Sequence, residues 1–186
     1  RNKLTIIGPT HLLFYLEEFS TRIQHLAFEF IDCEDLMKTG SKVLPNLSIE
    51  TIPVIHCSNS FACIVHHIEN KWCVVFSGDT RPSQALIEAA KKYQPDLLIH
   101  EATFEHELLQ DAIQKTHSTT TEAIEVGRAM QARLTMLTHF SQRYPKPPHQ
   151  HGADVKDPYK YGVAFDLMTI EGESLNRPSE ILSKLF

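Results

Sequence analysis

Four segments of this sequence end in side chains that could bind a metal or move a proton. Each segment is a short apolar run, as expected for a buried strand, and the polar residues at their ends are His56, Asp79, His100-Glu101 and His139. Each residue alone has an ordinary explanation, because strand-end histidines are often structural and a strand-end aspartate often caps the next helix. If the strands lie side by side, however, these residues meet at one edge of the sheet, where α/β proteins place their chemistry.

Two imidazoles and one carboxylate at such an edge form a ligand set suited to zinc. His56 and His139 would supply the nitrogens, and Asp79, with its two oxygens, could bridge two ions. A two-metal site of this kind stabilises the attacking and leaving oxygens of phosphodiester hydrolysis. Three ligands are too few for two ions, so the pattern predicts further ligands elsewhere.

The stretch 72–80 shows how the chain would position such a residue. The apolar run 72–76 predicts a buried strand, Ser77-Gly78 predicts a turn, and Asp79 follows at once. A helix is expected over 82–93. Strand, glycine turn, acid and helix therefore form one unit around Asp79.

The other elements follow from hydrophobic periodicity. Strands are expected at 4–7, 26–31, 49–56, 61–67, 96–100 and 134–138, with two more short strands inside 162–170 around Asp166. Helices are expected at 11–19, 105–115, 120–131 and 179–185, whereas 33–47 and 141–158 have the composition of loops. This alternation predicts an α/β fold without a linker that would divide it.

Composition narrows the class of protein. The chain has 186 residues with 42% hydrophobic and 22% charged content, which is ordinary for a globular domain, and no stretch approaches the roughly 20 apolar residues of a membrane span. A net charge of −5 excludes a generally basic nucleic-acid binder, although a local phosphate site remains compatible with it. The four cysteines show no CxxC pair, so we expect reduced thiols in an intracellular protein, with Cys63 and Cys73 in the core.

Several short motifs occur in a fixed order along the chain: HCSNSFACIVHH (56–67), SGDT (77–80), HEAT (100–103), HST (117–119), HFSQRY (139–144) and GVAFD (162–166). Together they closely resemble the long form of the ribonuclease Z (tRNase Z) family, strongly over 56–166 and weakly before it. The resemblance implies the metallo-β-lactamase fold, an αββα sandwich. It also implies a zinc-dependent endoribonuclease that removes the 3′ trailer of precursor tRNA, with two zinc ions in the complete active site.

The resemblance implies a role for individual residues. His56 would bind one zinc, His139 the other, and Asp79 would bridge them. His117 would protonate the leaving 3′ oxygen, with Glu101 orienting it or a metal-bound histidine. The residues that would face the scissile phosphate or the 3′ end of the tRNA are Ser118, Thr119, Ser141, Arg143 and Tyr144.

One motif of that family has no counterpart in this sequence. The family uses HxHxDH to supply most remaining ligands, whereas His66-His67 is an adjacent pair inside a predicted strand. We therefore expect residues 1–186 to be the C-terminal part of a metallo-β-lactamase-type catalytic domain. The remaining part of the same polypeptide would supply HxHxDH, and the fragment alone is expected to be inactive.

Two other functions fit the same residues. One is a different hydrolase of this fold, acting on a small phosphodiester or a thioester, which HEAT and HST argue against. The other is a non-catalytic module that keeps the fold to bind RNA or a protein partner, although His56, Asp79 and His139 are all present. The long form of the family implies a nuclear and mitochondrial location, and no membrane partner is expected.

Overall fold

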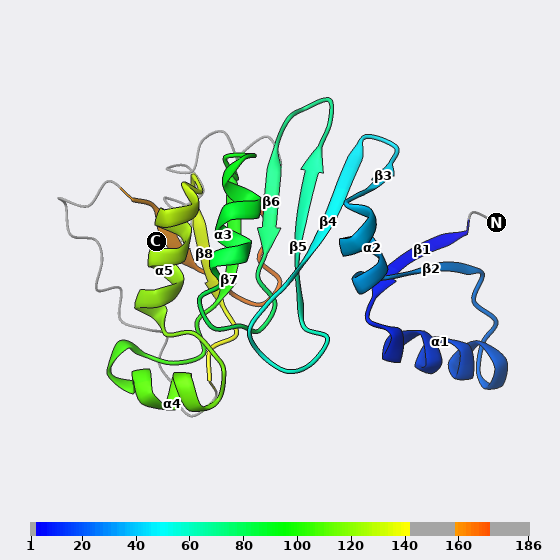
Figure 1. Cartoon of the computed structure of the whole chain (residues 1–186), viewed down its shortest axis with the longest axis horizontal. Helices are drawn as coiled ribbons and strands as arrows, with labels where there is room; N and C mark the ends of the chain where they lie inside the picture. Colours follow the sequence, from blue (N-terminus) through cyan, green and yellow to red (C-terminus); the bar gives the residue numbers. More distant parts are fainter. Residues whose placement is uncertain (1–2, 142–158, 172–186) are drawn as a thin grey trace.

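A seven-stranded mixed sheet dominates the computed structural model, which describes residues 3–141 and 159–171 (Figure 1). In sheet order, its strands are β3 (Lys42–Leu44), β4 (Leu47–Pro53), β5 (Phe61–His67), β6 (Cys73–Phe76), β7 (Leu97–Glu101), β8 (Thr135–Thr138) and β9 (Tyr161–Val163). The mixed α/β architecture predicted from the sequence is confirmed.

Strand direction decides which ends share an edge. β4 is antiparallel to β5, and β5 is antiparallel to β6, so β4 and β6 run the same way. β6, β7, β8 and β9 are mutually parallel. The carboxyl ends of β4, β6, β7 and β8 therefore lie at one edge of the sheet, which is the arrangement that the predicted ligands require.

Two helices cover one face of this sheet: α3 (Gln84–Lys91) and α5 (Thr120–Met130) (Figure 1). Ile64, Val75 and Leu98 from the strands meet Leu86 and Met130 from the helices, and all five side chains are buried. Because successive side chains of a strand point to opposite faces, each central strand contributes alternate residues to this core. The space between the sheet and these two helices is thus filled by a hydrophobic core, which supports the sheet edge where the predicted ligands lie.

The opposite face of the sheet is also apolar. Val74, Leu97, Ile99 and Met136 lie there with the segment that follows β9. They line part of a groove of about 460 Å³, which is completed by Trp72, Ala164, Phe165, Met168 and Ile170. Strands with apolar residues on both faces are typical of a sheet that is covered on both sides.

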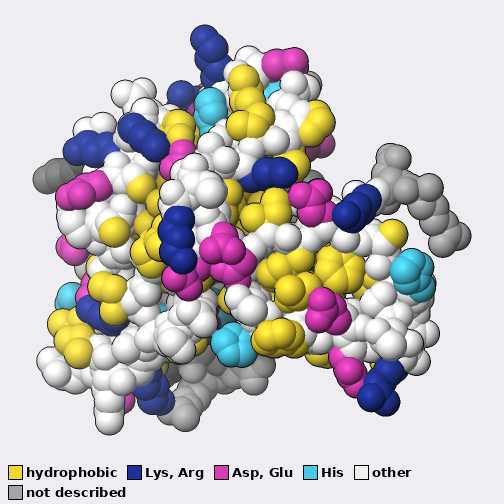
Figure 2. All heavy atoms as spheres, turned by 45° about the vertical axis from the view of Figure 1, so that its right-hand side comes forward, with side chains coloured by type: hydrophobic (Ala, Val, Ile, Leu, Met, Phe, Trp, Pro, Cys, Tyr) yellow, Lys and Arg dark blue, Asp and Glu magenta, His cyan; other side chains and the backbone are white. Residues whose placement is uncertain are grey.

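A second, two-stranded parallel sheet stands beside the large one. It consists of β1 (Leu4–Gly8) and β2 (Phe28–Asp32), joined by α1 (Thr10–Arg22). The short helix α2 (Cys33–Thr39) links β2 to the large sheet and packs against β4. Figure 2 shows hydrophobic side chains on the surface of the part of the molecule that is turned forward there.

The structure corrects two expectations about local structure. The predicted loop 33–47 contains α2 and β3, because the Asp32 carboxylate caps α2 by accepting hydrogen bonds from the backbone N–H groups of Glu34 and Asp35. In 159–171, β9 is the single strand, and a turn replaces the second strand expected after Asp166. The helix expected at 179–185 lies outside the described residues.

The remaining helical segment contains a short 3-10 turn (His106–Leu108) followed by α4 (Leu109–Gln114), close to the predicted helix at 105–115. None of the helices in the described ranges has the length and apolar composition that a membrane crossing requires. All four cysteines are free thiols; Cys73 is buried and Cys63 is half-buried.

Candidate active site

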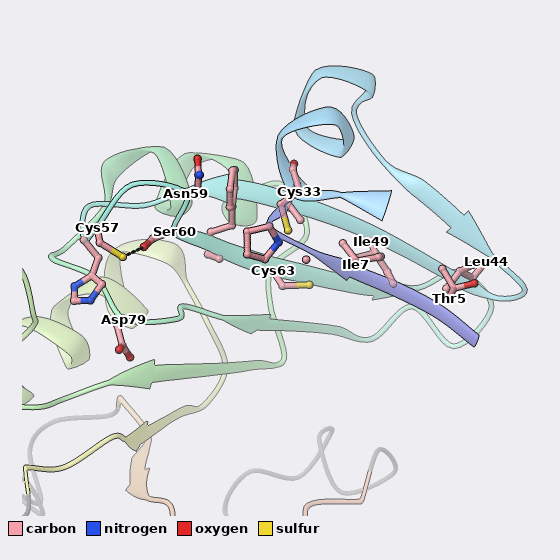
Figure 3. A pocket seen from close by; sticks show the side chains of 16 residues that line it. Thr5, Ile7, Cys33, Leu44, Ile49, Cys57, Asn59, Ser60, Cys63 and Asp79 are labelled. Carbon is pink, nitrogen blue, oxygen red and sulfur yellow. Dashed lines mark hydrogen bonds between the residues drawn. The ribbon is translucent and has the colours of Figure 1, made fainter. Parts of the chain in front are cut away.

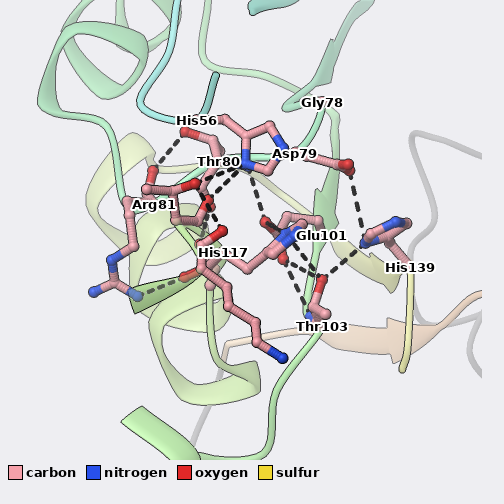
Figure 4. Close-up of polar contacts among 12 residues, drawn as sticks. His56, Gly78, Asp79, Thr80, Arg81, Glu101, Thr103, His117 and His139 are labelled. Carbon is pink, nitrogen blue, oxygen red and sulfur yellow. Dashed lines mark hydrogen bonds and ion pairs between the residues drawn. The ribbon is translucent and has the colours of Figure 1, made fainter. Parts of the chain in front are cut away.

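Five polar side chains meet at the shared edge of the large sheet, and we call them the edge cluster: His56, Asp79, Glu101, His117 and His139 (Figure 4). Ligand-capable atoms of His56, Asp79 and His117 lie within 4.8 Å of one another, as do those of Glu101, His117 and His139. The His117 ring lies between the other two, 4.7 Å from the His56 ring and 5.4 Å from the His139 ring, centroid to centroid. The predicted convergence of strand ends therefore occurs.

A glycine turn presents Asp79 to the cluster. Gly78 has φ +59°, and a Cβ at this position would lie 3.1 Å from the backbone oxygen of Phe61. Any other L-residue would be both strained and crowded here. The turn places Asp79 with its side chain 40% exposed and its Oδ1 3.6 Å from His139 Nδ1.

Glu101 is buried at the end of β7 and has every lone-pair direction occupied. Its Oε1 accepts hydrogen bonds from the Thr80 N–H at 2.9 Å and from His117 Nδ1 at 2.8 Å. Its Oε2 accepts from the N–H and the hydroxyl of Thr103, at 3.1 and 2.8 Å. A carboxylate has about four acceptor sites. Glu101 is therefore committed to holding the site together and has none left for a metal.

Hydrogen bonds also decide which nitrogen each histidine offers. His56 Nδ1 lies 2.9 Å from the carbonyl oxygen of Thr116, which can only accept, so Nδ1 carries the proton. The Thr103 hydroxyl donates to Glu101, so it accepts from His139 Nδ1 at 2.8 Å. His117 Nδ1 likewise donates to Glu101. Each neutral ring thus has its lone pair on Nε2.

This donor set fits zinc. Zinc-binding histidines characteristically donate their second ring N–H to a carbonyl or carboxylate, as His56 and His117 do, and nitrogen with carboxylate oxygen is a typical zinc ligand set. Of the predicted ligands, His56 and Asp79 lie in one group, and His139 lies in the other with its Nδ1 3.6 Å from Asp79 Oδ1. His117 belongs to both groups, so its position is compatible with a ligand or with a proton donor.

Three residues that the sequence interpretation passed over hold the cluster in place. Thr103 joins Glu101 to His139, and Thr116, at φ +56°, turns its carbonyl toward His56. Arg81 donates to the carbonyl oxygen of His117 at 2.6 Å. The sequence signals were the threonine inside HEAT and the arginine directly after SGDT, but neither has a recognisable role without its spatial partner.

Ser118 and Thr119, which were expected to contact a phosphate, form hydrogen bonds inside the chain. Both are buried; the Ser118 hydroxyl donates to the carbonyl oxygen of Thr80 at 2.6 Å, and Thr119 caps α5 by accepting from the N–H of Glu122. Their hydroxyl groups are therefore used inside the chain. The Ser141 N–H donates to the carbonyl oxygen of Thr103 at 3.3 Å, so Ser141 lies beside the cluster, while Arg143 and Tyr144 fall outside the described residues.

Burial changes the charge preference of two groups near the cluster. His100 is fully buried, and desolvation lowers the pKa of its imidazole despite a hydrogen bond to the Glu101 carbonyl oxygen. Burial alone would raise the pKa of the Glu122 carboxyl, but hydrogen bonds from Arg81 and Thr119 outweigh it and the pKa is lowered. His100 is therefore held neutral and Glu122 charged.

A cavity of about 650 Å³ opens beside the cluster. It extends from Asp79 and Cys57 at one end to Thr5 and Leu44 at the other, between β1 and the large sheet (Figure 3). His56 also lines it. The two predicted ligands thus border a space large enough for several additional side chains.

Comparison with known proteins agrees with this geometry. Residues 1–140 match the family described as the β-lactamase superfamily domain. Zinc phosphodiesterase ELAC protein 2 of Mus musculus is 38% identical over 183 residues, which cover 90% of this chain and 21% of that protein. The mitochondrial tRNAse Z TRZ4 of Arabidopsis thaliana is 40% identical over 158 residues, which cover 78% of this chain and 16% of that protein.

Solved structures show the same fold. A long form RNase Z from yeast superposes with a TM-score of 0.78 at 26% identity, over 99% of this chain and 30% of that one. The short form of human tRNase Z has a TM-score of 0.68 at 21% identity, over 92% of this chain and 68% of that one. The expected metallo-β-lactamase fold is confirmed, and the chain spans only 21% of the length of its mouse relative. This chain belongs to the metallo-β-lactamase superfamily, and its homologues there are tRNase Z proteins.

Proposed function

We propose that the protein containing this chain is a zinc-dependent endoribonuclease that removes the 3′ trailer of precursor tRNA. The observation that carries the proposal is the edge cluster, in which three histidines gather with the carboxylates of Asp79 and Glu101. The names of the mouse and Arabidopsis relatives add the substrate class and the metal. Because the chain spans about a fifth of such a relative, the activity is proposed for the longer protein.

Two zinc ions would occupy the complete site. His56 would hold one, His139 the other, and the Asp79 carboxylate both. Bound zinc would supply Lewis-acid stabilisation of the charge that develops on the phosphate. The hydrogen bonds from His56 to Thr116 and from His139 to Thr103 would leave the Nε2 lone pair of each ring available.

His117 would act as the general acid. Water attacks the phosphorus and gives its proton to a base that the HxHxDH part of the polypeptide would supply. The bond from phosphorus to the 3′ oxygen breaks, and the imidazolium form of His117 passes its Nε2 proton to that oxygen. The tRNA is left with a 3′ hydroxyl and the trailer with a 5′ phosphate. The hydrogen bond from Nδ1 to Glu101 fixes the ring for this transfer, in the way a buried carboxylate orients a catalytic histidine.

Substrate contacts and remaining ligands would come from several places. Ser141, Arg143 and Tyr144 follow His139 directly, so we propose them as contacts to the scissile phosphate or the 3′ end. The remaining ligands would come from an HxHxDH motif elsewhere in the polypeptide. The cavity bordered by His56 and Asp79 supports this, because it leaves room for additional side chains next to the cluster.

The cellular location is also a proposal. Relatives from Arabidopsis thaliana and Schizosaccharomyces pombe carry the word mitochondrial in their names. We propose a mitochondrial location on that basis, and a nuclear one from the resemblance to the long form of the family.

The test compares the full-length wild-type protein with its Asp79→Ala variant on precursor tRNA, with zinc measured by plasma mass spectrometry. We expect about two zinc ions per wild-type molecule, and a loss of cleavage of about 10³-fold or more in the variant, the scale of losing a central charge-stabilising group. RNA binding should remain. The exposed Asp111→Ala variant, on α4, serves as the control and should cleave like the wild type.

Other outcomes would favour the alternatives. A wild-type protein that binds precursor tRNA without cutting it is a binding module. One that hydrolyses a small phosphodiester or a thioester but leaves precursor tRNA intact is a different hydrolase of this fold. Undiminished cleavage by Asp79→Ala would rule out a two-metal site bridged by this carboxylate.

A further inference from the structure

Arg81 and Glu122 form a shielded ion pair next to the edge cluster. Arg81 Nη1 donates to Glu122 Oε2 at 2.8 Å, and Nη2 donates to Oε1, so the contact is bidentate. Each side chain is only 17% exposed. A bidentate guanidinium–carboxylate pair with little solvent access is geometrically well defined, unlike most exposed ion pairs.

The pair joins the two loops that carry the chemistry. Arg81 lies in the turn that presents Asp79, and its Nη1 also donates to the carbonyl oxygen of His117 at 2.6 Å. A second tie runs parallel to the first, because the Ser118 hydroxyl donates to the carbonyl oxygen of Thr80. The Asp79 turn and the His117 loop are thus connected at two adjacent points.

Glu122 extends the connection into α5. Its Oε2 accepts from the N–H and the hydroxyl of Thr119, each at 3.0 Å, which completes a capping box. The same carboxylate therefore fixes the start of α5 and the guanidinium of Arg81. The backbone of His117 is held between a rigid helix and the Asp79 turn.

We infer that the Arg81–Glu122 pair is a positioning device that sets His117 against the site centred on Asp79. The Arg81 guanidinium donates to the carboxylate of Glu122 and to the carbonyl oxygen of His117, so it acts through the backbone of His117. The hydrogen bond to Glu101 sets the ring orientation of His117, and Arg81 sets the place of its main chain. This inference rests on the proposed role of His117 as the acid.

The test uses two variants of the full-length protein, Arg81→Met and Arg81→Met/Glu122→Gln. The single variant leaves a half-buried carboxylate without its cation, so it should lose much stability. The double variant is neutral, and glutamine keeps the capping-box acceptor. It should regain stability, while the carbonyl oxygen of His117 still lacks its donor. Comparison of the two variants therefore separates the effect on stability from the effect on the position of His117.

We expect the double variant to bind zinc like the wild type and to keep KM for precursor tRNA, with kcat about 10- to 100-fold lower, the cost of a displacement near 1 Å. A series of aryl phosphodiesters provides the second readout. Good leaving groups need no proton, so the loss should be small for p-nitrophenol and grow as the phenol becomes less acidic.

A matched control uses an ion pair at the opposite edge of the sheet. Arg133 Nη1 lies 3.0 Å from Asp96 Oδ1, next to the starts of β7 and β8. Arg133→Met should lower stability without changing kcat or the dependence on the leaving group.

Two results would overturn the inference: recovery of kcat together with stability in the double variant, or an equal loss for every phenol. If the wild type hydrolyses aryl phosphodiesters but not precursor tRNA, the tRNA proposal fails, and the aryl series still decides the role of Arg81. If it hydrolyses neither, both fail.

Discussion

The three histidines of the edge cluster each commit one ring nitrogen to a hydrogen bond, and the partner differs. His56 donates to a backbone carbonyl and His139 to a hydroxyl, whereas His117 donates to the carboxylate of Glu101. A carboxylate partner is found both for catalytic histidines and for zinc-binding ones, and a neutral acceptor likewise leaves the Nε2 lone pair for a metal. Hydrogen bonding at the residue scale is thus compatible with the proposed division, in which His117 is the acid and His56 and His139 are ligands.

Substitution of His117 tests this division. In the full-length protein, His117→Ala should reduce cleavage by about 10²- to 10⁴-fold, the usual contribution of a general acid, while zinc per molecule stays at the wild-type value. His139→Ala is the matched comparison and should lose zinc. Zinc content, measured by plasma mass spectrometry, distinguishes a general acid from a zinc ligand. Loss of zinc from His117→Ala would show that His117 is a ligand and contradict its proposed role as the acid.

Turns and strand directions decide where the cluster lies. β4, β6, β7 and β8 point the same way, so four strand ends deliver side chains to one edge. This placement depends on sharp turns of the backbone just beyond the strands, which direct the side chains toward the sheet edge. Gly78 makes such a turn at positive φ, and His139 itself adopts φ +59° directly after β8.

Replacing Gly78 should therefore disturb both stability and metal binding. We expect Gly78→Ala to lower the free energy of unfolding by about 1–3 kcal/mol from backbone strain, and the contact with the Phe61 oxygen should shift Asp79 and weaken zinc binding. Gly40→Ala is the control, because Gly40 also has positive φ but nothing lies within 4 Å of its added Cβ. It should lose stability and keep zinc. Denaturant unfolding and chelator competition measure the two effects; wild-type zinc affinity in Gly78→Ala would contradict the argument.

At the scale of the whole molecule, the cluster stands on a sheet with apolar residues on both faces. Helices α3 and α5 cover one face, and the segment after β9 lies on part of the other. His100 is buried beneath the cluster, and its Nε2 has no hydrogen-bond partner among the residues that the structure describes. Because protonation of this buried nitrogen is unfavourable, the free energy of unfolding should depend on pH.

The sign of that dependence follows from the lowered pKa of His100. In the folded state the ring stays neutral, whereas the unfolded chain takes up a proton near pH 6.5, so this stability is complete above pH 6.5 and declines below it. The slope should approach about 1.4 kcal/mol per pH unit for one proton.

The check is denaturant unfolding from pH 7.5 to about 5, the range in which a histidine titrates. His100→Asn keeps a donor near the position of Nδ1, so it should be less stable at neutral pH but show a shallower decline. The exposed His25→Asn controls for the loss of one imidazole. An unchanged slope in His100→Asn would show that other groups govern acid stability.

Local sequence patterns located most of the elements and identified the chemical groups at their ends. Short continuous apolar runs located β5 and β6 closely, and His56, Asp79 and His139 were recognisable because each follows an apolar segment. Local patterns suffice there, because burial of a strand and the end of that burial are properties of consecutive residues. The segment 33–47 was missed because the cap of α2 came from Asp32, outside the window that looked like a loop.

Only the tertiary structure decided how those groups are held. Glu101 was expected to orient a histidine, but its four hydrogen bonds come from residues 80, 103 and 117. The Arg81–Glu122 pair spans 41 positions, and Ser118 and Thr119 proved to be internal supports. Such partners are brought together by the order and direction of the strands, which depend on long-range pairing. No local pattern encodes that pairing, so the residues that could do chemistry were readable from the sequence, and the contacts that position them were not.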